Sequence, residues 1–231
     1  MALTGTAIVS PSVFQPASKF PSMLDHILLG CSNLDDGLVF VEQHTGVRAA
    51  FGGVHPDRGT VNALLSLGEG HYLEIIAPDP NAKSVQPWAN PMRETLSGLK
   101  SPRLINWAAH TRDIEGLAKK LQESDISVLV TRPGSRRRPD GSVLRWKSFN
   151  LADDHHGVLP FFIEWDANSL HPSVDAPAGC KIDYFAAADQ KPFELSKIFR
   201  LMEIDVQIES AEKPQLRARI AGPKGTLEVS S

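Results

Sequence analysis

Four polar residues stand inside apolar, strand-like segments, where an unpaired polar group is costly. They are His26, Glu74, Asn106 and Glu164. A carboxylate at the centre of such a strand is stable only if it is paired, hydrogen-bonded or bound to a metal. One imidazole, two carboxylates and an amide oxygen suit a divalent cation such as Zn, Fe, Mn, Ni or Mg. Each residue taken alone is also consistent with a solvated sheet face or a structural hydrogen bond.

Alternation along a strand sends residues two positions apart to the same face. The neighbours predicted to share a face with the four polar residues are Leu28, Tyr72, His110 and Phe162. We expect Leu28, Tyr72 and Phe162 to contact a bound substrate. His110 is a candidate general acid or base, because histidine titrates near neutral pH. A histidine at the rim, hydrogen-bonded to the backbone, is the alternative for that residue.

The elements that would position these residues follow one order three times: strand, helix, then three strands. Helix caps and glycine stops predict the four helices, and β-branched or apolar runs predict the strands. The predicted helices are 34–44, 90–99, 114–123 and 192–202. The predicted strands are 24–30, 60–67, 70–77, 103–110, 126–132, 142–150, 158–165, 181–187, 204–209, 216–221 and 225–230, with a long turn over 133–141.

This repeat divides the chain into modules rather than into domains joined by linkers. We expect a flexible tail over 1–22, paired modules over 23–79 and 102–167 within a unit 23–175, and a third module over 178–231. The fold class is α+β. Because the third module has no partner module, it would expose an edge or a face, which favours packing on another chain and a homodimer.

Several short motifs, in the same order along the chain, resemble the vicinal oxygen chelate superfamily and in particular its glyoxalase-like domain subgroup. The stretches that carry the resemblance are Leu-Asp-His at 24–26, Gly-Gly-Val-His at 52–55, Tyr-Leu-Glu-Ile-Ile-Ala at 72–77, Gly-Ser-Val-Leu-Arg-Trp at 141–146 and Leu-Pro-Phe-Phe-Ile-Glu-Trp at 159–165. The resemblance covers residues 23–230.

The resemblance implies that two β-α-β-β-β modules pair into a cupped mixed sheet with a metal between them. Its ligands would be His26 and Glu74 from the first module and Asn106 and Glu164 from the second, and Glu164 or Glu74 would move a proton. A lyase, isomerase or dioxygenase acting on a small oxygenated molecule is then expected. Family enzymes commonly have His or Gln where this chain has Asn106. The alternative is therefore a metal-free protein that binds or sequesters a small molecule in the same cavity.

Two further candidates for substrate contact lie outside the strand register. Asn62 belongs to a glycine-rich segment that resembles the subgroup, where it would line the cavity or shape a loop. Arg137 belongs to the arginine run 136–138 in the predicted turn. That run is either a solvated loop or an anion clamp at the cavity mouth, because an arginine fork matches a carboxylate or phosphate.

Composition excludes several other functions. The 231 residues carry a formal net charge of -3 without an arginine- and aromatic-rich patch, which argues against nucleic-acid binding. No apolar run approaches the roughly 18 residues of a membrane span. Two cysteines, Cys31 and Cys180, cannot form a disulfide scaffold. We expect a cytoplasmic protein that acts on a small molecule.

Overall fold

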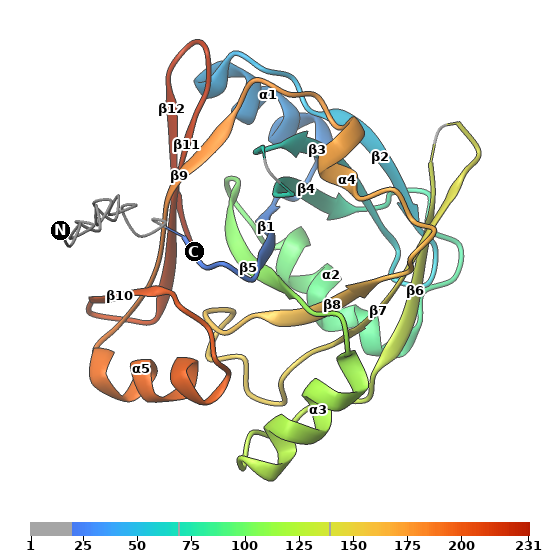
Figure 1. Cartoon of the computed structure of the whole chain (residues 1–231). Helices are drawn as coiled ribbons and strands as arrows, with labels where there is room; N and C mark the ends of the chain where they lie inside the picture. Colours follow the sequence, from blue (N-terminus) through green and yellow to red (C-terminus); the bar gives the residue numbers. More distant parts are fainter. Residues whose placement is uncertain (1–19, 69, 139) are drawn as a thin grey trace, which may run out of the picture.

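Eight strands form a sheet that closes into a barrel (Figure 1), in the computed structural model, which describes residues 20–231 except 69 and 139. The strand order around the barrel is β1-β4-β3-β2-β6-β7-β8-β5. The strands are β1 (Leu24–Gly30), β2 (Ala50–His55), β3 (Thr60–Ser66), β4 (Tyr72–Pro78), β5 (Arg103–His110), β6 (Arg132–Arg137), β7 (Val143–Phe149) and β8 (Phe161–Trp165).

The barrel consists of two halves with the same pairing. In each half the first strand runs parallel to the last, β1 beside β4 and β5 beside β8. The halves join through antiparallel pairs, β1 with β5 and β2 with β6. The predicted mixed, curled sheet within an α+β fold is therefore confirmed, with the curl closing into a barrel.

Predicted capping side chains begin two of the five helices in the described residues. The five helices are α1 (Leu34–Thr45), α2 (Asn90–Ser97), α3 (Ile114–Glu123), α4 (Pro172–Asp175), which was not predicted, and α5 (Pro192–Leu201), with a 3₁₀ turn η1 (Pro87–Ala89) before α2. The Asn33 side chain accepts the backbone N–H of Asp35 at the start of α1, and Gly46 ends that helix with a φ of 81°. Asp113 caps α3 in the same way through Gly116.

The C-terminal unit follows the expected order of elements but pairs its strands differently. Its sheet contains β9 (Lys181–Asp189), β10 (Gln207–Ser210), β11 (Gln215–Ala221) and β12 (Thr226–Ser230), in the order β10-β9-β11-β12. The first and last strands are therefore not neighbours, unlike in the barrel halves. Asp183 of β9 forms an ion pair with Arg219 of β11 at 2.8 Å.

One face of this second sheet is buried against the barrel instead of being exposed. Trp107 of β5 is fully buried, and its ring centroid lies 5.2 Å from that of Phe185 on β9. Residues of both sheets belong to one hydrophobic cluster. The apolar face of this sheet is therefore covered by the barrel, whereas residues on its opposite face are partly or fully exposed, so the expectation of an exposed edge or face stays a prediction. The homodimer stays a prediction.

Two adjacent segments differ from the sequence expectation. The predicted strand 126–132 makes a single bridge, Val128 with Leu151, and the predicted turn contains β6. Strand β6 closes the barrel by pairing along β7 and at one position with β2, where Arg137 lies opposite Val54. These tertiary pairs outweigh the local turn signals of proline and glycine.

The tail was predicted over 1–22, and residues 1–19 of it lie outside the described residues. Its last residues contact the rest of the chain: Ser22 donates both its backbone N–H and its hydroxyl to Asp205, each at 2.9 Å. No helix within the described part of the chain is long and apolar enough to cross a lipid bilayer.

Candidate functional site

The barrel opens onto a cavity of about 1000 Å³, which is lined by the inward faces of its strands together with residues of η1, α2 and neighbouring loops. His26 and Leu28 of β1 and Tyr72 and Glu74 of β4 point into it, as their alternation predicts. Asn62 of β3 also lines it. The cavity therefore contains most of the polar groups expected from the first module.

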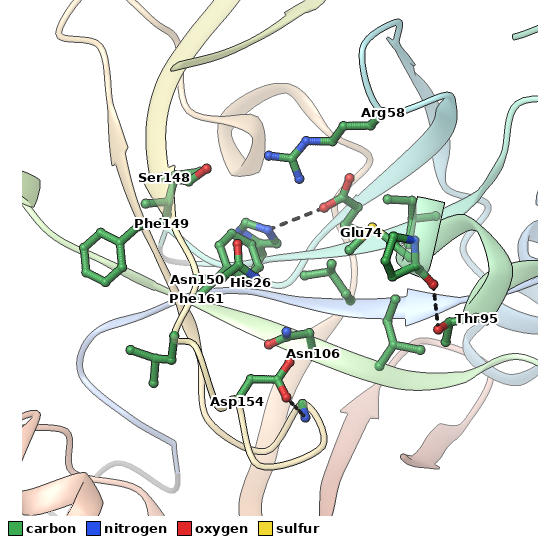
Figure 2. Close-up of a pocket in the computed structure, with 18 of the residues that line it drawn as sticks. His26, Arg58, Glu74, Thr95, Asn106, Ser148, Phe149, Asn150, Asp154 and Phe161 are labelled. Atoms are coloured by element: carbon green, nitrogen blue, oxygen red, sulfur yellow. Dashed lines mark hydrogen bonds and ion pairs between the residues drawn. The ribbon is translucent and has the colours of Figure 1, made fainter. Parts of the chain in front are cut away.

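His26 and Glu74 form a buried pair in this cavity (Figure 2). The Nε2 atom of His26 lies 3.4 Å from Oε2 of Glu74. The two residues are 2% and 7% exposed. The other carboxylate oxygen of Glu74 accepts a 2.6 Å hydrogen bond from the Asn62 amide. The Tyr72 ring stacks on the His26 ring with centroids 4.4 Å apart, which fixes the plane of the imidazole.

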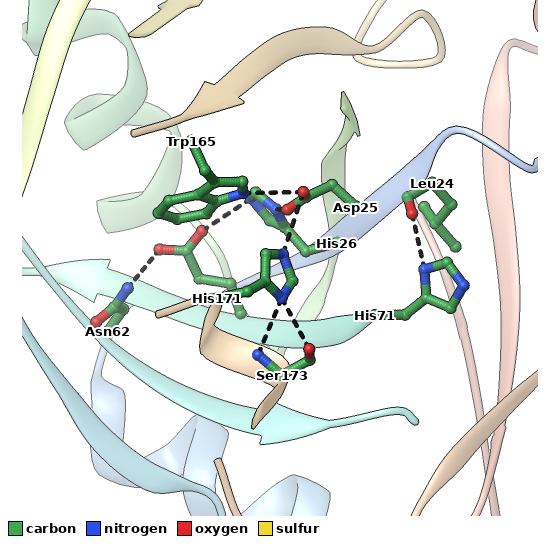
Figure 3. A network of polar contacts seen from close by, with 9 residues as sticks. Leu24, Asp25, His26, Asn62, His71, Trp165, His171 and Ser173 are labelled. Carbon is green, nitrogen blue, oxygen red and sulfur yellow. Dashed lines mark hydrogen bonds and ion pairs between the residues drawn. The ribbon is translucent and has the colours of Figure 1, made fainter. Parts of the chain in front are cut away.

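A second carboxylate, Asp25, holds the opposite nitrogen of His26 (Figure 3). The Nδ1 atom of His26 lies 2.6 Å from Oδ1 of Asp25. Oδ2 of Asp25 accepts the indole N–H of Trp165 at 2.9 Å and lies 3.2 Å from Nε2 of His171. The carboxylate is 2% exposed, so these three side chains replace its hydration.

The two carboxylates set the charge of His26. Burial alone would lower the pKa of His26, but hydrogen bonds and charges from Asp25 and Glu74 raise it to about 9. Burial alone would raise the pKa of Glu74, but His26 and Asn62 lower it to about 2. The pKa of Asp25 is lowered well below its ordinary value, because His171 and His26 outweigh burial. At neutral pH the site therefore contains an imidazolium between two carboxylates.

Glu164 lies outside the cavity, which corrects its predicted role as metal ligand and proton carrier. Its Oε2 accepts the backbone N–H of Ile114, at 2.7 Å, at the start of α3. Phe161, Ile163 and Trp165, on the other face of β8, line the cavity instead. A carboxylate at a helix N-terminus meets free N–H groups and the positive end of the helix dipole, which accounts for its place.

The strand ladders explain why the face of β8 is reversed. Across the β1–β5 pair, Leu28 lies opposite Asn106 and His26 lies opposite Ala108. These two pairs are equivalent if Asn106 in the second half of the barrel corresponds to His26 in the first, and Ala108 to Leu28. Leu28 also pairs with Glu74, whereas Ala108 pairs with Phe161. Phe161 thus occupies the position that corresponds to Glu74. A register displaced by an odd number of residues exchanges the two faces of a strand.

Three other predicted residues also lie away from the cavity. Phe162 is fully buried on the outer face of β8, where its ring stacks on Phe149 at 5.1 Å. His110 is exposed at the end of β5 and does not line the cavity. Arg137 is exposed, and its guanidinium donates to the backbone oxygen of Gly141.

The sequence of residues 24–200 matches the family described as the glyoxalase-like domain. The chain belongs to the glyoxalase-like domain family. The resemblance to the vicinal oxygen chelate superfamily, and to this subgroup of it, is thereby confirmed. A comparison with curated protein sequences gave no match.

Solved structures are similar to this glyoxalase-like chain to different degrees, and the first of the three that follow shares its fold. A hypothetical protein from Staphylococcus aureus is 17% identical, with a TM-score of 0.63 over 90% of this chain and 84% of that one. Methylmalonyl-CoA epimerase from Streptomyces coelicolor, in complex with 2-nitronate-propionyl-CoA, is 23% identical, with a TM-score of 0.46 over 63% and 98%. The epimerase from Mycobacterium tuberculosis is 16% identical, with a TM-score of 0.43 over 66% and 91%.

Members of the superfamily usually bind a divalent metal, but the donors of this glyoxalase-like chain do not fit the predicted four-ligand centre. His26 and Glu74 meet, and Asn106 lines the same cavity. The amide oxygen of Asn106, however, accepts the backbone N–H of Trp107 at 2.7 Å, and Glu164 caps α3. Among the described residues, no group of three or more His, Cys, Asp or Glu is arranged to hold a metal ion.

Three further residues lie at the cavity or hold its side chains, although they were not predicted as site residues. Asp25 carried no signal in the alternation of β1, because adjacent residues on a regular strand point to opposite faces. Arg136, rather than Arg137, faces the cavity, and an alternation beginning at Arg132 would have shown this if the segment had been read as a strand. Arg58 precedes β3 in a turn and carried no periodic signal.

Proposed function

We propose that this chain is an acid/base enzyme that moves a proton at a carbon beside a carbonyl group of an oxygenated small molecule. The observation that carries the proposal is the buried His26–Glu74 pair, which is open to the cavity on one side and held by Asp25 on the other. Of the reaction types expected from the sequence, isomerase and lyase steps need the proton transfer that such a pair performs.

Glu74 is the base in this proposal. Its carboxylate is ionised at neutral pH, and Asn62 holds one oxygen at 2.6 Å while the other faces His26. His26 is the acid and the hydrogen-bond donor. Its Nε2 lies 3.4 Å from Glu74, which is longer than the 2.7–2.9 Å of a strong charge-assisted hydrogen bond. A substrate oxygen entering between the two side chains would therefore accept this N–H in place of Glu74, with the imidazole held in position by Asp25 and Tyr72.

The step conserves protons and charge. The C–H bond beside the carbonyl breaks, and its proton passes to the Glu74 carboxylate. The electrons of the C–H bond form the C=C bond of an enolate, and the carbonyl π electrons move to its oxygen, which the His26 imidazolium stabilises by a hydrogen bond. Return of the proton from Glu74 to the same or a neighbouring carbon completes an isomerisation. In an elimination, the enolate reforms the carbonyl as a group on the next carbon leaves with its bonding electrons, and that group takes up the proton from Glu74. Asp25 orients the imidazole through Nδ1 and is a positioning residue.

Exchange with solvent deuterium tests the proposal without knowledge of the product. The protein is incubated in D₂O with a panel of 2-oxo acids and hydroxy ketones, and ¹H NMR follows loss of the C–H signal beside the carbonyl. We expect exchange with the wild type, loss of it in Glu74→Gln and His26→Gln, and retention in Glu164→Gln. Absence of exchange across the panel, or equal rates in Glu74→Gln, overturns the proposal.

A metal-free binding protein is the second candidate function, and the apolar part of the cavity favours it. Leu28, Ile76 and Phe149 provide contact area that proton transfer does not require. Such a protein would be stabilised against heat by its ligand through mass action, and chelator would not change this stabilisation. Ligand binding in the absence of any deuterium exchange would favour this candidate over the enzyme.

A further inference from the structure

The cavity is larger and more positively charged than the proton transfer itself requires. Its volume of about 1000 Å³ lies at the upper end of the range for pockets that enclose drug-sized ligands. Among the described residues, five Lys or Arg side chains line it against two carboxylate side chains, and one of these carboxylates, Glu74, is already paired with His26. The unbalanced charge indicates an anionic ligand.

Arg136 is the most buried of the five Lys and Arg side chains that line the cavity. It is 4% exposed, and its Nη1 donates to Oδ1 of Asn62 at 3.1 Å, so Asn62 links it to Glu74. A side chain on Gly52 would overlap both Arg136 and the Asn62 oxygen. The glycine thus provides the space in which this guanidinium lies. A buried guanidinium with one neutral partner retains donors for a ligand.

Arg58 supplies a second guanidinium above Glu74 (Figure 2). Its side chain lines the cavity and, among the described residues, forms no hydrogen bond or ion pair. Its contact is a cation–π interaction with Trp88, whose ring centroid lies 5.7 Å away, and Arg132 contacts the same ring at 5.1 Å. Trp88 thereby holds two cations at the cavity without neutralising either.

The rest of the wall is apolar and comes from both halves of the barrel. Leu28, Ile76, Leu104, Phe149 and Phe161 line it. An aliphatic or aromatic ligand body lying along these side chains would remove its own apolar surface from water, at about 0.8 kcal/mol for each buried CH₂. A small acid such as acetate has no such body and would not gain this burial.

We propose that the ligand of this cavity is an amphiphilic carboxylate, with its head group bound by Arg58 and Arg136 and its apolar body along the wall. The inference deepens the proposed function and rests on it only for the reaction at His26 and Glu74. The head group near Glu74 places the carbons next to the carboxylate within reach of the base. The chemical class is a medium-chain or aromatic oxo acid.

Binding of matched probes tests the inference. Octanoate, butyrate, octan-1-ol and octylamine are titrated against the wild type, with quenching of Trp146 and Trp165, which line the cavity, as the readout. We expect octanoate to bind at least about tenfold more tightly than each of the other three probes. Arg58→Met and Arg136→Met should each weaken octanoate binding by about tenfold, whereas the exposed Arg137→Met should leave it unchanged.

Each outcome decides the inference separately from the proposed function. Equal binding of octan-1-ol and octanoate overturns the anionic head, and equal binding of butyrate overturns the apolar body. Should Arg136→Met fail to fold, Arg58→Met carries the test, because the Arg58 side chain has no hydrogen bond or ion pair to lose among the described residues. Octanoate binding without deuterium exchange on any oxo acid supports the inference and contradicts the enzyme. Exchange on small ketones without octanoate binding supports the enzyme and overturns the inference.

Discussion

The Nδ1 atom of His26 lies 2.6 Å from the carboxylate of Asp25, the residue that precedes it on the same strand. Neighbours on a regular strand point to opposite faces and cannot make this contact. The β1–β5 ladder is irregular here: Leu24 lies opposite Ala109 and His26 opposite Ala108, so Asp25 is left without a partner of its own. Such a bulge redirects a side chain, and here it brings a carboxylate to the back of the imidazole (Figure 3).

Replacing Asp25 by Asn should lower both stability and exchange activity. The change removes a buried charge that His26, His171 and Trp165 share. Breaking a buried ion pair costs roughly 3–5 kcal/mol of unfolding free energy. Urea denaturation measures this, and NMR titration of His26 should show a lower pKa. Asp183→Asn, which removes a partly exposed ion pair, is the control and should cost about 1 kcal/mol or less. Equal losses in the two variants would contradict the buried role of Asp25.

The stabilising effect of the His26–Glu74 pair should depend on pH in a defined direction. The pKa of His26 is raised from 6.5 to about 9, so its contribution to stability is complete below pH 6.5 and is lost as the pH rises through 9. The pKa of Glu74 is lowered from 4.5 to about 2, so its contribution is complete above pH 4.5 and is lost as the pH falls through 2.

The measurement compares the unfolding free energies of the wild type and His26→Gln by urea denaturation at intervals from pH 5 to 10. The stability advantage of the wild type should be largest near pH 5–6.5 and should shrink toward pH 9. Exchange activity should fall over the same alkaline range, because His26 loses the proton that it donates. A difference in unfolding free energy that is constant with pH would show that folding does not shift the pKa of His26.

Glu164 and Glu74 should respond differently to the same substitution. Glu164→Gln removes a charge from the N-terminus of α3 and should cost about 0.5–1 kcal/mol of stability, with exchange activity unchanged. Glu74→Gln should abolish exchange, because the amide cannot accept the carbon proton. Thermal denaturation and the deuterium assay measure the two effects. Loss of exchange in Glu164→Gln would show that this carboxylate takes part in the proton transfer.

Gly52→Ala should weaken carboxylate binding while leaving the fold intact. The new methyl group would displace the ends of two side chains, Arg136 and Asn62, which can move without shifting the backbone. We expect about a tenfold loss of octanoate affinity, which corresponds to 1.4 kcal/mol, in the tryptophan titration. Gly98→Ala is the matched control, because its methyl group would meet neighbours at ordinary contact distances of 3.5 Å or more. Unchanged affinity in Gly52→Ala would mean that Arg136 does not hold the ligand.

Local sequence signals were sufficient for the helices and for one side of the site. Asn33, Asp113 and Gly46 define helix ends through contacts within one turn, which need no tertiary information. Alternation identified the inward faces at His26 and Glu74, because the β1–β4 ladder that joins their strands is regular from His26 to Gly30.

Tertiary structure decided the other side of the site. Whether Phe161 or Glu164 faces the cavity depends on the register between β5 and β8, which are separated along the chain by the rest of the second module. The contact of Asp25 with His26 depends on a bulge, and the inward position of Arg136 depends on closure of the barrel by β6. The sequence alone determined which residues could do chemistry, whereas strand pairing between distant segments determined which of them share one cavity, because a one-residue change of register exchanges the two faces of a strand.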